Sequence, residues 1–250
     1  FSCFFAFYYR ILLSIHKFDN KIINTTEMEN TNILIIKFRD YISDDEVYFF
    51  RSAIIQKLEN KSEVLFHNHL DKDKYRYSYP LIQYKKIKQK AAIVCIDKGT
   101  EVIGSFISQC DLDLQLGKRN LNMQIDSLIP YKIQIQQCSE LANYHIHKWL
   151  PLNSDNYRKY LKMDGLTEKV TFLENILIGN LLSFTKGINV FLDFHIQCKI
   201  TQINFPQLII NKDVKLMSFN IDFQSNIYIP EYIGIGKSTS IGYGIVTQHH

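Results

Sequence analysis

The sequence is poor in the residues that mark unstructured or fibrous chains. Its 250 residues include only 10 glycines and 5 prolines, and 46% are hydrophobic against 22% charged. The scarcity of glycine and proline excludes collagen-like and low-complexity chains, and the hydrophobic content is too high for an intrinsically disordered protein. The length suits one large domain or two small ones. We therefore expect a folded globular protein.

Paired cysteines are also missing. The five cysteines include no Cys-x-x-Cys pair, and their number is odd. Cys95 and Cys198 lie in apolar, strand-like runs, which is typical of buried and reduced thiols. Because disulfides are rare in reducing compartments, this usage predicts a cytoplasmic protein.

The apolar N-terminal segment lacks the marks of a membrane span or a secretory signal. Residues 1–27 precede the first methionine, Met28, and Arg10 interrupts the apolar run. A membrane span needs about 20 predominantly apolar residues, and a signal peptide needs a basic start and a small-residue cleavage site. We expect no membrane segment here, and we interpret residues 1–27 as a non-native or disordered extension.

Hydrophobic periodicity predicts an α+β chain of two domains. In residues 28–122 we expect a strand at 32–38, a helix over 43–60 with Ser43 as its N-cap, and two strands joined by a basic turn. A second helix from residue 99 and a strand near 119–125 follow. This order is that of a ferredoxin-like β-α-β-β-α-β domain, whose sheet has one helix-covered face and one open face suited to RNA. Residues 123–250, with a long helix ending at Gly187, are interpreted as a second such domain.

A basic stripe crosses the middle of the first domain. Between Lys72 and Lys90, seven basic residues accompany one acid, so this window carries a net charge of +6 when the whole chain carries +4. Tyrosines alternate with these charges, and aromatic rings stack on unpaired bases where lysine and arginine contact phosphates. The pattern predicts an RNA-binding surface, and an ordinary solvated face is the alternative. Its predicted RNA contacts are Lys72, Arg76, Lys85, Lys86 and Lys88.

Four of the ten glycines lie between residues 234 and 244, around a Gly-Lys-Ser-Thr stretch. An ATP-binding phosphate loop would need glycine at position 231, which is Glu231. A dinucleotide fingerprint would need glycine in place of Thr239. The glycines instead form two Gly-Φ-Gly units, with Φ apolar, separated by five residues. Glycine allows close approach of the backbone to phosphate, so the segment predicts an anion site; a purely structural hairpin is the alternative.

This doubled glycine motif, behind two ferredoxin-like domains, resembles the glycine-rich loop of the CRISPR-associated repeat-RNA endoribonucleases of the RAMP superfamily. The resemblance implies an enzyme that cleaves CRISPR repeat RNA into guide RNAs without metal or other cofactor. The expected products carry a 2′,3′-cyclic phosphate and a 5′-hydroxyl. It assigns RNA contacts to Gly234, Gly236, Lys237, Gly242 and Gly244.

The stretch His67-Asn68-His69 lies where the resembling family carries its catalytic histidine, in one branch as a His-x-His pair followed by a tyrosine. The resemblance implies that His67 and His69 are catalytic, and Tyr75 or Tyr77 could match the tyrosine, of which we take Tyr77. Histidine can act as acid or base near neutral pH, and a nearby cation can stabilise charge on the phosphate. Two alternatives remain: a zinc site, for which only Asp71 and Asp73 lie nearby as further ligands, and plain surface histidines.

A second His-x-His pair, His145 and His147, precedes Trp149. We interpret it as a structural or RNA-stacking segment, with catalysis as the alternative, and we expect His195 to lie in a sheet. Two other functions remain open, a non-catalytic RNA-binding subunit of a CRISPR effector complex and a metal-dependent nuclease. The expected partner is CRISPR repeat RNA, with other effector subunits and a homodimer as further options and no membrane partner.

Overall fold

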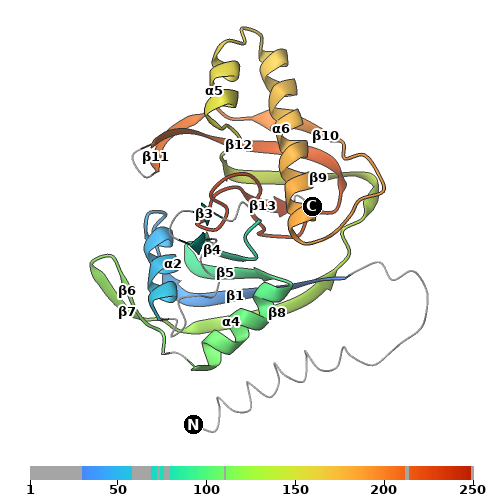
Figure 1. Cartoon of the computed structure of the whole chain (residues 1–250). Coiled ribbons are helices and arrows are strands. Elements are labelled where there is room, and N and C mark those ends of the chain that lie inside the picture. The colour runs from blue at the N-terminus through green and yellow to red at the C-terminus, as the bar shows by residue number, and fades with distance from the viewer. Residues whose placement is uncertain are drawn as a thin grey trace, which may run out of the picture.

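The computed structural model describes residues 30–57, 69–71, 74–75, 79–109, 111–211 and 214–248. They form two α+β domains, one below the other in Figure 1, each built around an antiparallel sheet. This confirms the predicted fold class. The predicted extension at residues 1–27 lies outside the described residues.

The first domain has the strand order of a ferredoxin-like fold. Its sheet runs β4-β5-β1-β8, with every neighbouring pair antiparallel. Two short hairpins, β2–β3 and β6–β7, are inserted into this frame. The elements are β1 (Thr31–Tyr41), α2 (Glu46–Gln56), β2 (His69–Asp71), β3 (Lys74–Tyr75), β4 (Ile82–Ile87), β5 (Lys90–Ile96), α4 (Lys98–Gln109), β6 (Asp113–Leu116), β7 (Arg119–Asn122) and β8 (Ile125–Ile133).

The last strand of this sheet lies later in the chain than the sequence indicated. The predicted boundary after residue 122 places residues 125–133 in the second domain. In the structure these residues form β8, which pairs with β1 of the first domain through Ile35↔Ile129 and Ile33↔Tyr131. A local sequence pattern identifies a strand but does not say which sheet the strand joins.

The second domain repeats the same strand order but has no helix between its third and fourth sheet strands. Its sheet runs β10-β12-β9-β13, and β11 pairs with the start of β12. Residues 228–244, between β12 and β13, contain no helix, and the glycine-rich segment takes the place of the second ferredoxin-like helix. The elements are β9 (Gln137–Trp149), α5 (Ser154–Leu161), α6 (Leu166–Gly187), β10 (Cys198–Ile203), β11 (Gln207–Asn211), β12 (Val214–Ile227) and β13 (Ile245–Gln248).

Both faces of the first sheet are covered. On one face, Phe38 and Tyr84 pack with α2 and α4 in a buried cluster. On the other face, Ile35 and Val94 belong to a cluster that continues into the second domain, where it includes Trp149, Leu181 and Phe223. The open face predicted for this sheet is therefore closed by the second domain.

Among the described residues, the second sheet is covered on one face only. Along β9, Tyr144 and Ile146 are buried, whereas the intervening His145 is half-buried and His147 is exposed. Such alternation is typical of an antiparallel sheet with one solvated face. His195 was expected in a sheet, but it is exposed in the irregular segment before β10. Within the ranges that the structure describes, no helix is long and apolar enough to span a membrane.

Candidate functional site

A cleft of about 350 Å³ lies where the two domains meet. The first domain contributes the loop before α2, the first turns of that helix and the end of β4. The second domain contributes the end of β9, the glycine-rich segment and the start of β13. The lining residues are Asp44, Asp45, Val47, Tyr48, Lys86, His147, Lys148, Ile241, Gly242, Tyr243 and Ile245.

Two lysines from different domains converge on one carboxylate in this cleft. The Asp44 carboxylate accepts Lys86 Nζ on Oδ1 at 2.7 Å and Lys148 Nζ on Oδ2. The Asp44 side chain is 48% exposed and the lysine side chains 20% and 25%. Partial burial disfavours the charged carboxylate, but the hydrogen bonds from Lys148 and Lys86 outweigh it and hold the pKa of Asp44 below its ordinary value. Asp44 is therefore ionised at neutral pH, and the three groups carry a net positive charge.

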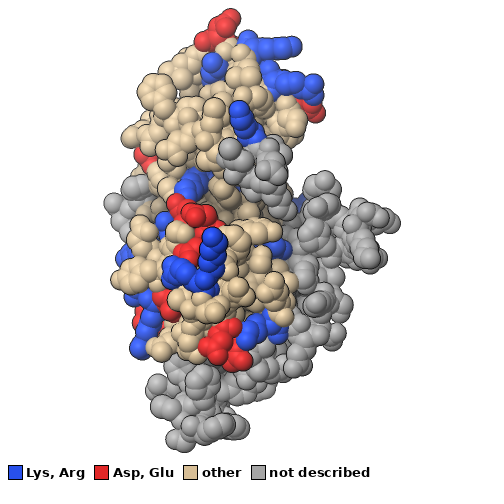
Figure 2. All heavy atoms as spheres, turned by 90° about the vertical axis from the view of Figure 1, so that its left-hand side faces the viewer, with Lys and Arg blue, Asp and Glu red and all other residues tan. Residues whose placement is uncertain are grey.

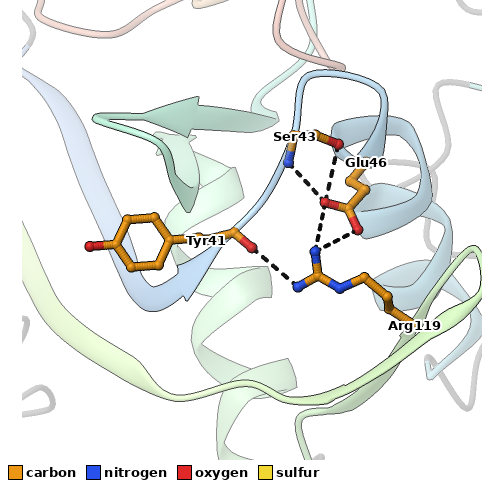
Figure 3. A network of polar contacts seen from close by, with 4 residues as sticks. All are labelled: Tyr41, Ser43, Glu46 and Arg119. Carbon is orange, nitrogen blue, oxygen red and sulfur yellow. Dashed lines mark hydrogen bonds and ion pairs between the residues drawn. The ribbon is translucent and has the colours of Figure 1, made fainter.

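A polar network fixes the loop that carries Asp44 (Figure 3). Glu46 Oε2 accepts the backbone N–H of Ser43 at 2.8 Å and its hydroxyl at 3.1 Å. Arg119, from the β6–β7 hairpin, contacts Glu46 Oε1 at 3.0 Å and donates to the carbonyl of Tyr41 at 3.4 Å. Ser43 was predicted as the N-cap of α2, but that position belongs to Asp45, and Ser43 is held by Glu46 instead. The return of a glutamate side chain to an upstream N–H is half of a capping box.

An irregularity in β9 turns two consecutive side chains into the cleft. The register between β9 and β12 shifts after Ile146, and Lys148 has a φ of 53°. Its backbone N–H donates to Asn220 Oδ1 at 2.8 Å and its carbonyl accepts the N–H of Gly244. A bulge of this kind re-aims side chains that would otherwise alternate across the sheet. His147 and Lys148 consequently line the same cleft.

His147 and Tyr243, two titratable residues of the cleft, are in protonation states that suit the acceptance of a proton and the donation of a hydrogen bond. Partial burial of the ring, followed by the charge of Lys148, lowers the pKa of His147 below its ordinary value. Its imidazole is therefore neutral near pH 7 and able to accept a proton. Burial, and then the charge of Asp44, raises the pKa of Tyr243, so its phenol stays protonated and can donate a hydrogen bond.

The glycine-rich segment packs tightly between the domains. A Cβ on Gly234 would lie 2.5 Å from Thr239 Cβ, and one on Gly236 would lie 2.9 Å from the buried ring of Trp149. Tyr79, just before β4, donates to the carbonyl of Gly234 at 2.8 Å. Farther along the segment, the carbonyl of Ser240 accepts the backbone N–H of Tyr84 at 3.0 Å, which seats the segment against β4. At Gly234 and Gly236 the absence of a side chain lets the segment pack closely on itself and on Trp149, while its contacts with Tyr79 and Tyr84 join it to the first domain.

Several amides of this segment already have partners within the protein. The N–H of Gly234 donates to Gln83 Oε1 at 2.8 Å, and the N–H of Gly244 donates to the carbonyl of Lys148 at 3.0 Å. Lys237 Nζ donates to the carbonyl of Leu152 at 3.2 Å. For Gly234 and Gly244 this geometry favours the structural alternative to an anion site. Of the four glycines, Gly242, with a φ of 86°, is the one that lines the cleft.

The lysines predicted as one stripe point in different directions. Lys85 is fully buried on β4, so it cannot form part of the predicted surface as the protein stands. Lys86 reaches the cleft, and Lys88 is exposed in the turn between β4 and β5. Figure 2 shows acidic and basic side chains side by side at mid-height of one face, where the domains meet, rather than a continuous basic surface.

Most of the predicted catalytic residues lie outside the described part of the chain. This applies to His67 and Tyr77 and to the predicted RNA contacts Lys72 and Arg76. For His69 only the backbone is described, in β2, where it pairs with Tyr75. Figure 1 draws the β2–β3 hairpin at the level of the domain junction.

Sequence reasoning missed the site residues Asp44 and Lys148 and gave His147 a lesser role. Nothing in the sequence places Asp44 next to Lys148, because the two lie in different domains. Trp149, considered for RNA stacking, is buried beneath Gly236 and donates to Asn180 Oδ1 at 3.1 Å. In the described ranges, no three His, Cys, Asp or Glu side chains are grouped so that they could hold a metal ion.

Two family models together match nearly all of the chain after residue 28. The Cas6b N-terminal domain matches residues 29–149, and the Cas6b C-terminal domain matches residues 134–249. The chain belongs to the Cas6b family. This confirms the resemblance that the doubled glycine motif indicated.

Solved structures and one sequence relative agree with this Cas6b assignment. A crystal structure of Cas6b is 22% identical, with a TM-score of 0.81, and covers 88% of this chain and all of its own. A crystal structure of the CRISPR RNA processing endoribonuclease Cas6b is 21% identical over the same shares, with a TM-score of 0.67. At these identities the likeness shows the fold. An uncharacterised protein of Methanocaldococcus jannaschii is 35% identical over 106 residues, which are 41% of this chain and 69% of that protein.

Proposed function

We propose that this chain is a metal-independent endoribonuclease that cleaves CRISPR repeat RNA into guide RNAs. The observation that carries the proposal is the match of both Cas6b domains over residues 29–249, since a related Cas6b structure is that of a CRISPR RNA processing endoribonuclease. The cleft supports it, because it combines two cations, a neutral imidazole and a phenol at the junction of the two domains.

The proposed reaction uses the 2′-hydroxyl of the RNA as its own nucleophile. A base removes the hydroxyl proton, the 2′-oxygen forms a bond to the adjacent phosphorus, and the bond from phosphorus to the 5′-oxygen breaks. An acid returns a proton to the leaving 5′-oxygen, so the products are a 2′,3′-cyclic phosphate and a 5′-hydroxyl. Both roles suit histidine, and we assign them to His67 and His69, with Tyr77 assisting.

The remaining parts of the site bind and stabilise the phosphate. Lys86 and Lys148 offer positive charge where the phosphate gains negative charge during the reaction. Gly242 leaves the wall of the cleft open to close approach by an RNA backbone. Lys88, exposed in the turn after β4, adds a contact outside the cleft.

Cleavage of a labelled repeat RNA in the presence of EDTA tests this proposal. The wild type should cleave at one position, and the alanine variants of His67 and His69 should lose about 10²–10⁴-fold in rate, the usual contribution of a general acid or base. The 3′ ends should resist phosphatase until acid opens the cyclic phosphate. His195→Ala is the matched control, because His195 is exposed and lies outside the cleft.

Each other outcome points to a different function. Binding without cleavage would indicate an RNA-binding subunit, and cleavage that EDTA abolishes would indicate a metal-dependent nuclease. His147→Ala belongs in the same experiment, since His147 lines the cleft with a lowered pKa. If His147→Ala loses more than the His67 and His69 variants, the base is His147 and our assignment of the pair is wrong.

A further inference from the structure

One lysine from each domain contacts the same carboxylate, that of Asp44. Lys86 comes from β4 of the first domain and Lys148 from the end of β9 in the second, and each contacts its own oxygen of the Asp44 carboxylate. The loop that carries Asp44 is fixed by Glu46 and Arg119, so the carboxylate is held in place from the protein side.

A carboxylate that bridges two ammonium groups offers the same contacts as a phosphodiester. Each presents two anionic oxygens on one central atom, and each can accept one lysine on each oxygen. Lysine is an established phosphate ligand in proteins, acting as a point charge that tolerates some change in geometry. The two ammonium groups are therefore already spaced for an anion with two acceptor oxygens.

The bridge is also weak enough to exchange. The Asp44 side chain is 48% exposed, and an RNA strand entering the cleft would meet it directly. Exposed ion pairs contribute little to stability, because water screens them and side-chain entropy opposes them. A phosphate that brings further contacts along the RNA can therefore displace the carboxylate.

We propose that Asp44 holds, in the RNA-free protein, the position that one backbone phosphate of the bound RNA takes. This inference rests on the proposed function. On binding, Lys86 and Lys148 leave Asp44 for the phosphate, and the carboxylate turns toward solvent. Asp44 thereby subtracts from the affinity for every RNA. Strands held by few contacts fail to displace it, whereas a repeat RNA with contacts elsewhere succeeds.

The test measures binding of a repeat RNA that carries a 2′-deoxy substitution at the cleavage position, so that it is not cut. Asp44→Asn should bind it about two- to twenty-fold more tightly than the wild type, the range that two partly exposed ion pairs represent. Because the same single phosphate is contacted in both proteins, the slope of log affinity against log salt should differ between them by less than about 0.7. In a Lys148→Met background, the gain from Asp44→Asn should shrink.

Asp45→Asn is the matched control, because Asp45 lines the same cleft and its loss changes the net charge equally. It should change the affinity less than Asp44→Asn and leave the salt dependence unaltered. The inference is overturned if Asp44→Asn binds more weakly than the wild type, or gains no more than Asp45→Asn. Failure of the wild type to bind the RNA at all would overturn the proposed function as well.

A measurement on the wild type covers the case in which Asp44→Asn does not fold. The ¹³C signal of the Asp44 carboxyl should shift when the uncleavable RNA is added, because the carboxylate loses both lysines. An unchanged signal in an RNA-saturated sample would show that the bridge persists, and the inference would be wrong.

Discussion

The two domains share one strand order but differ at the sheet face that their own helices leave uncovered. In the first domain that face is closed by the second domain, and six of the seven residues of β5 are buried. In the second domain the face is open, and β9 and β12 alternate between buried and partly exposed residues. The comparison teaches that a continuous apolar strand predicts a sheet covered on both faces, even in an antiparallel fold where alternation is common.

Closing the first sheet has consequences for the polar residues on its covered face. The Gln83 amide on β4 accepts the N–H of Gly234 across the junction and donates to the Tyr79 hydroxyl within its own domain, at 2.8 Å each. Lys85, two residues farther on the same face, is fully buried, and its Nζ has no hydrogen-bond partner among the described residues. Burial lowers the pKa of Lys85 to about 7. The open sheet imposes no such demand.

Of the substitutions considered, Gly244→Ala should change the stability of the protein most. It disrupts the glycine-rich segment, which replaces the second ferredoxin-like helix in the second domain only. A Cβ at Gly244 would lie 1.9 Å from the carbonyl oxygen of Ile235, and its φ of 65° disfavours any side chain. We expect a loss of about 3–5 kcal/mol in the free energy of unfolding, from backbone strain and overpacking together. Urea denaturation checks this value.

Gly179→Ala is the control for that experiment. Gly179 lies in α6 of the same domain, and a Cβ there would meet no atom within 4 Å. Alanine is the better helix former by about 1 kcal/mol, so this variant should be as stable as the wild type or more so. Equal stability of the Gly244 and Gly179 variants would show that the glycine-rich segment does not have the backbone conformation described.

Lys85→Met should have the next largest effect, and it should stabilise the protein. Methionine fills a similar volume without a charge, so at pH 7 we expect a gain of about 2–4 kcal/mol, given that each unit of pKa is worth about 1.4 kcal/mol. The folded state has the lower lysine pKa, so between about 7 and the ordinary 10.5 the unfolded state binds more protons. Wild-type stability should therefore rise with pH across this window.

Urea denaturation at pH 7 and pH 9.5 measures this prediction. The advantage of Lys85→Met over the wild type should shrink at the higher pH. Lys88→Met is the control, because Lys88 is exposed in the adjacent turn and should show neither the gain nor its pH dependence. An equally stable Lys85→Met variant at pH 7 would mean that Lys85 reaches water in solution.

Asp222→Asn should have the smallest effect, and it probes the open face. Asp222 contacts His145 Nδ1 at 2.6 Å, and both side chains are about 30% exposed, at 31% and 28%. Polar contacts this close to solvent contribute about 0–1 kcal/mol, so thermal denaturation should show a loss in the free energy of unfolding of no more than about 1 kcal/mol. A larger loss would show that the face is covered in solution, and the contrast between the two sheets would then fail.

The sequence predicted the elements of this fold better than their partners. The order of strands and helices in the first domain, the long helix that ends at Gly187 and the absence of a nucleotide phosphate loop all follow from local patterns. The placement of β8 does not, because a strand pattern carries no information on which sheet it joins. Likewise, consecutive residues of β4 face opposite sides of the sheet, and the neighbouring sequence does not reveal which side Lys85 faces.

The candidate site was less predictable than the fold because it is assembled across the domain junction. Asp44 and Lys148 lie 104 positions apart in the sequence numbering, and Lys148 enters the cleft only through the irregularity in β9. Neither fact has a local signature. The doubled glycine motif indicated the family correctly, but two of its amides serve contacts within the protein.

The packing of the glycine-rich segment against β4 also determines when the cleft can form during translation. The contact between Gln83 and Gly234 joins residues 151 positions apart, and Ile241, Gly242 and Tyr243 form one wall of the cleft. Since domains fold largely as they emerge from the ribosome, the first sheet is complete while this wall is still unmade. A nascent chain therefore carries a folded first domain without the complete cleft, and the proposed RNA-binding site is finished only after the glycine-rich segment has been translated.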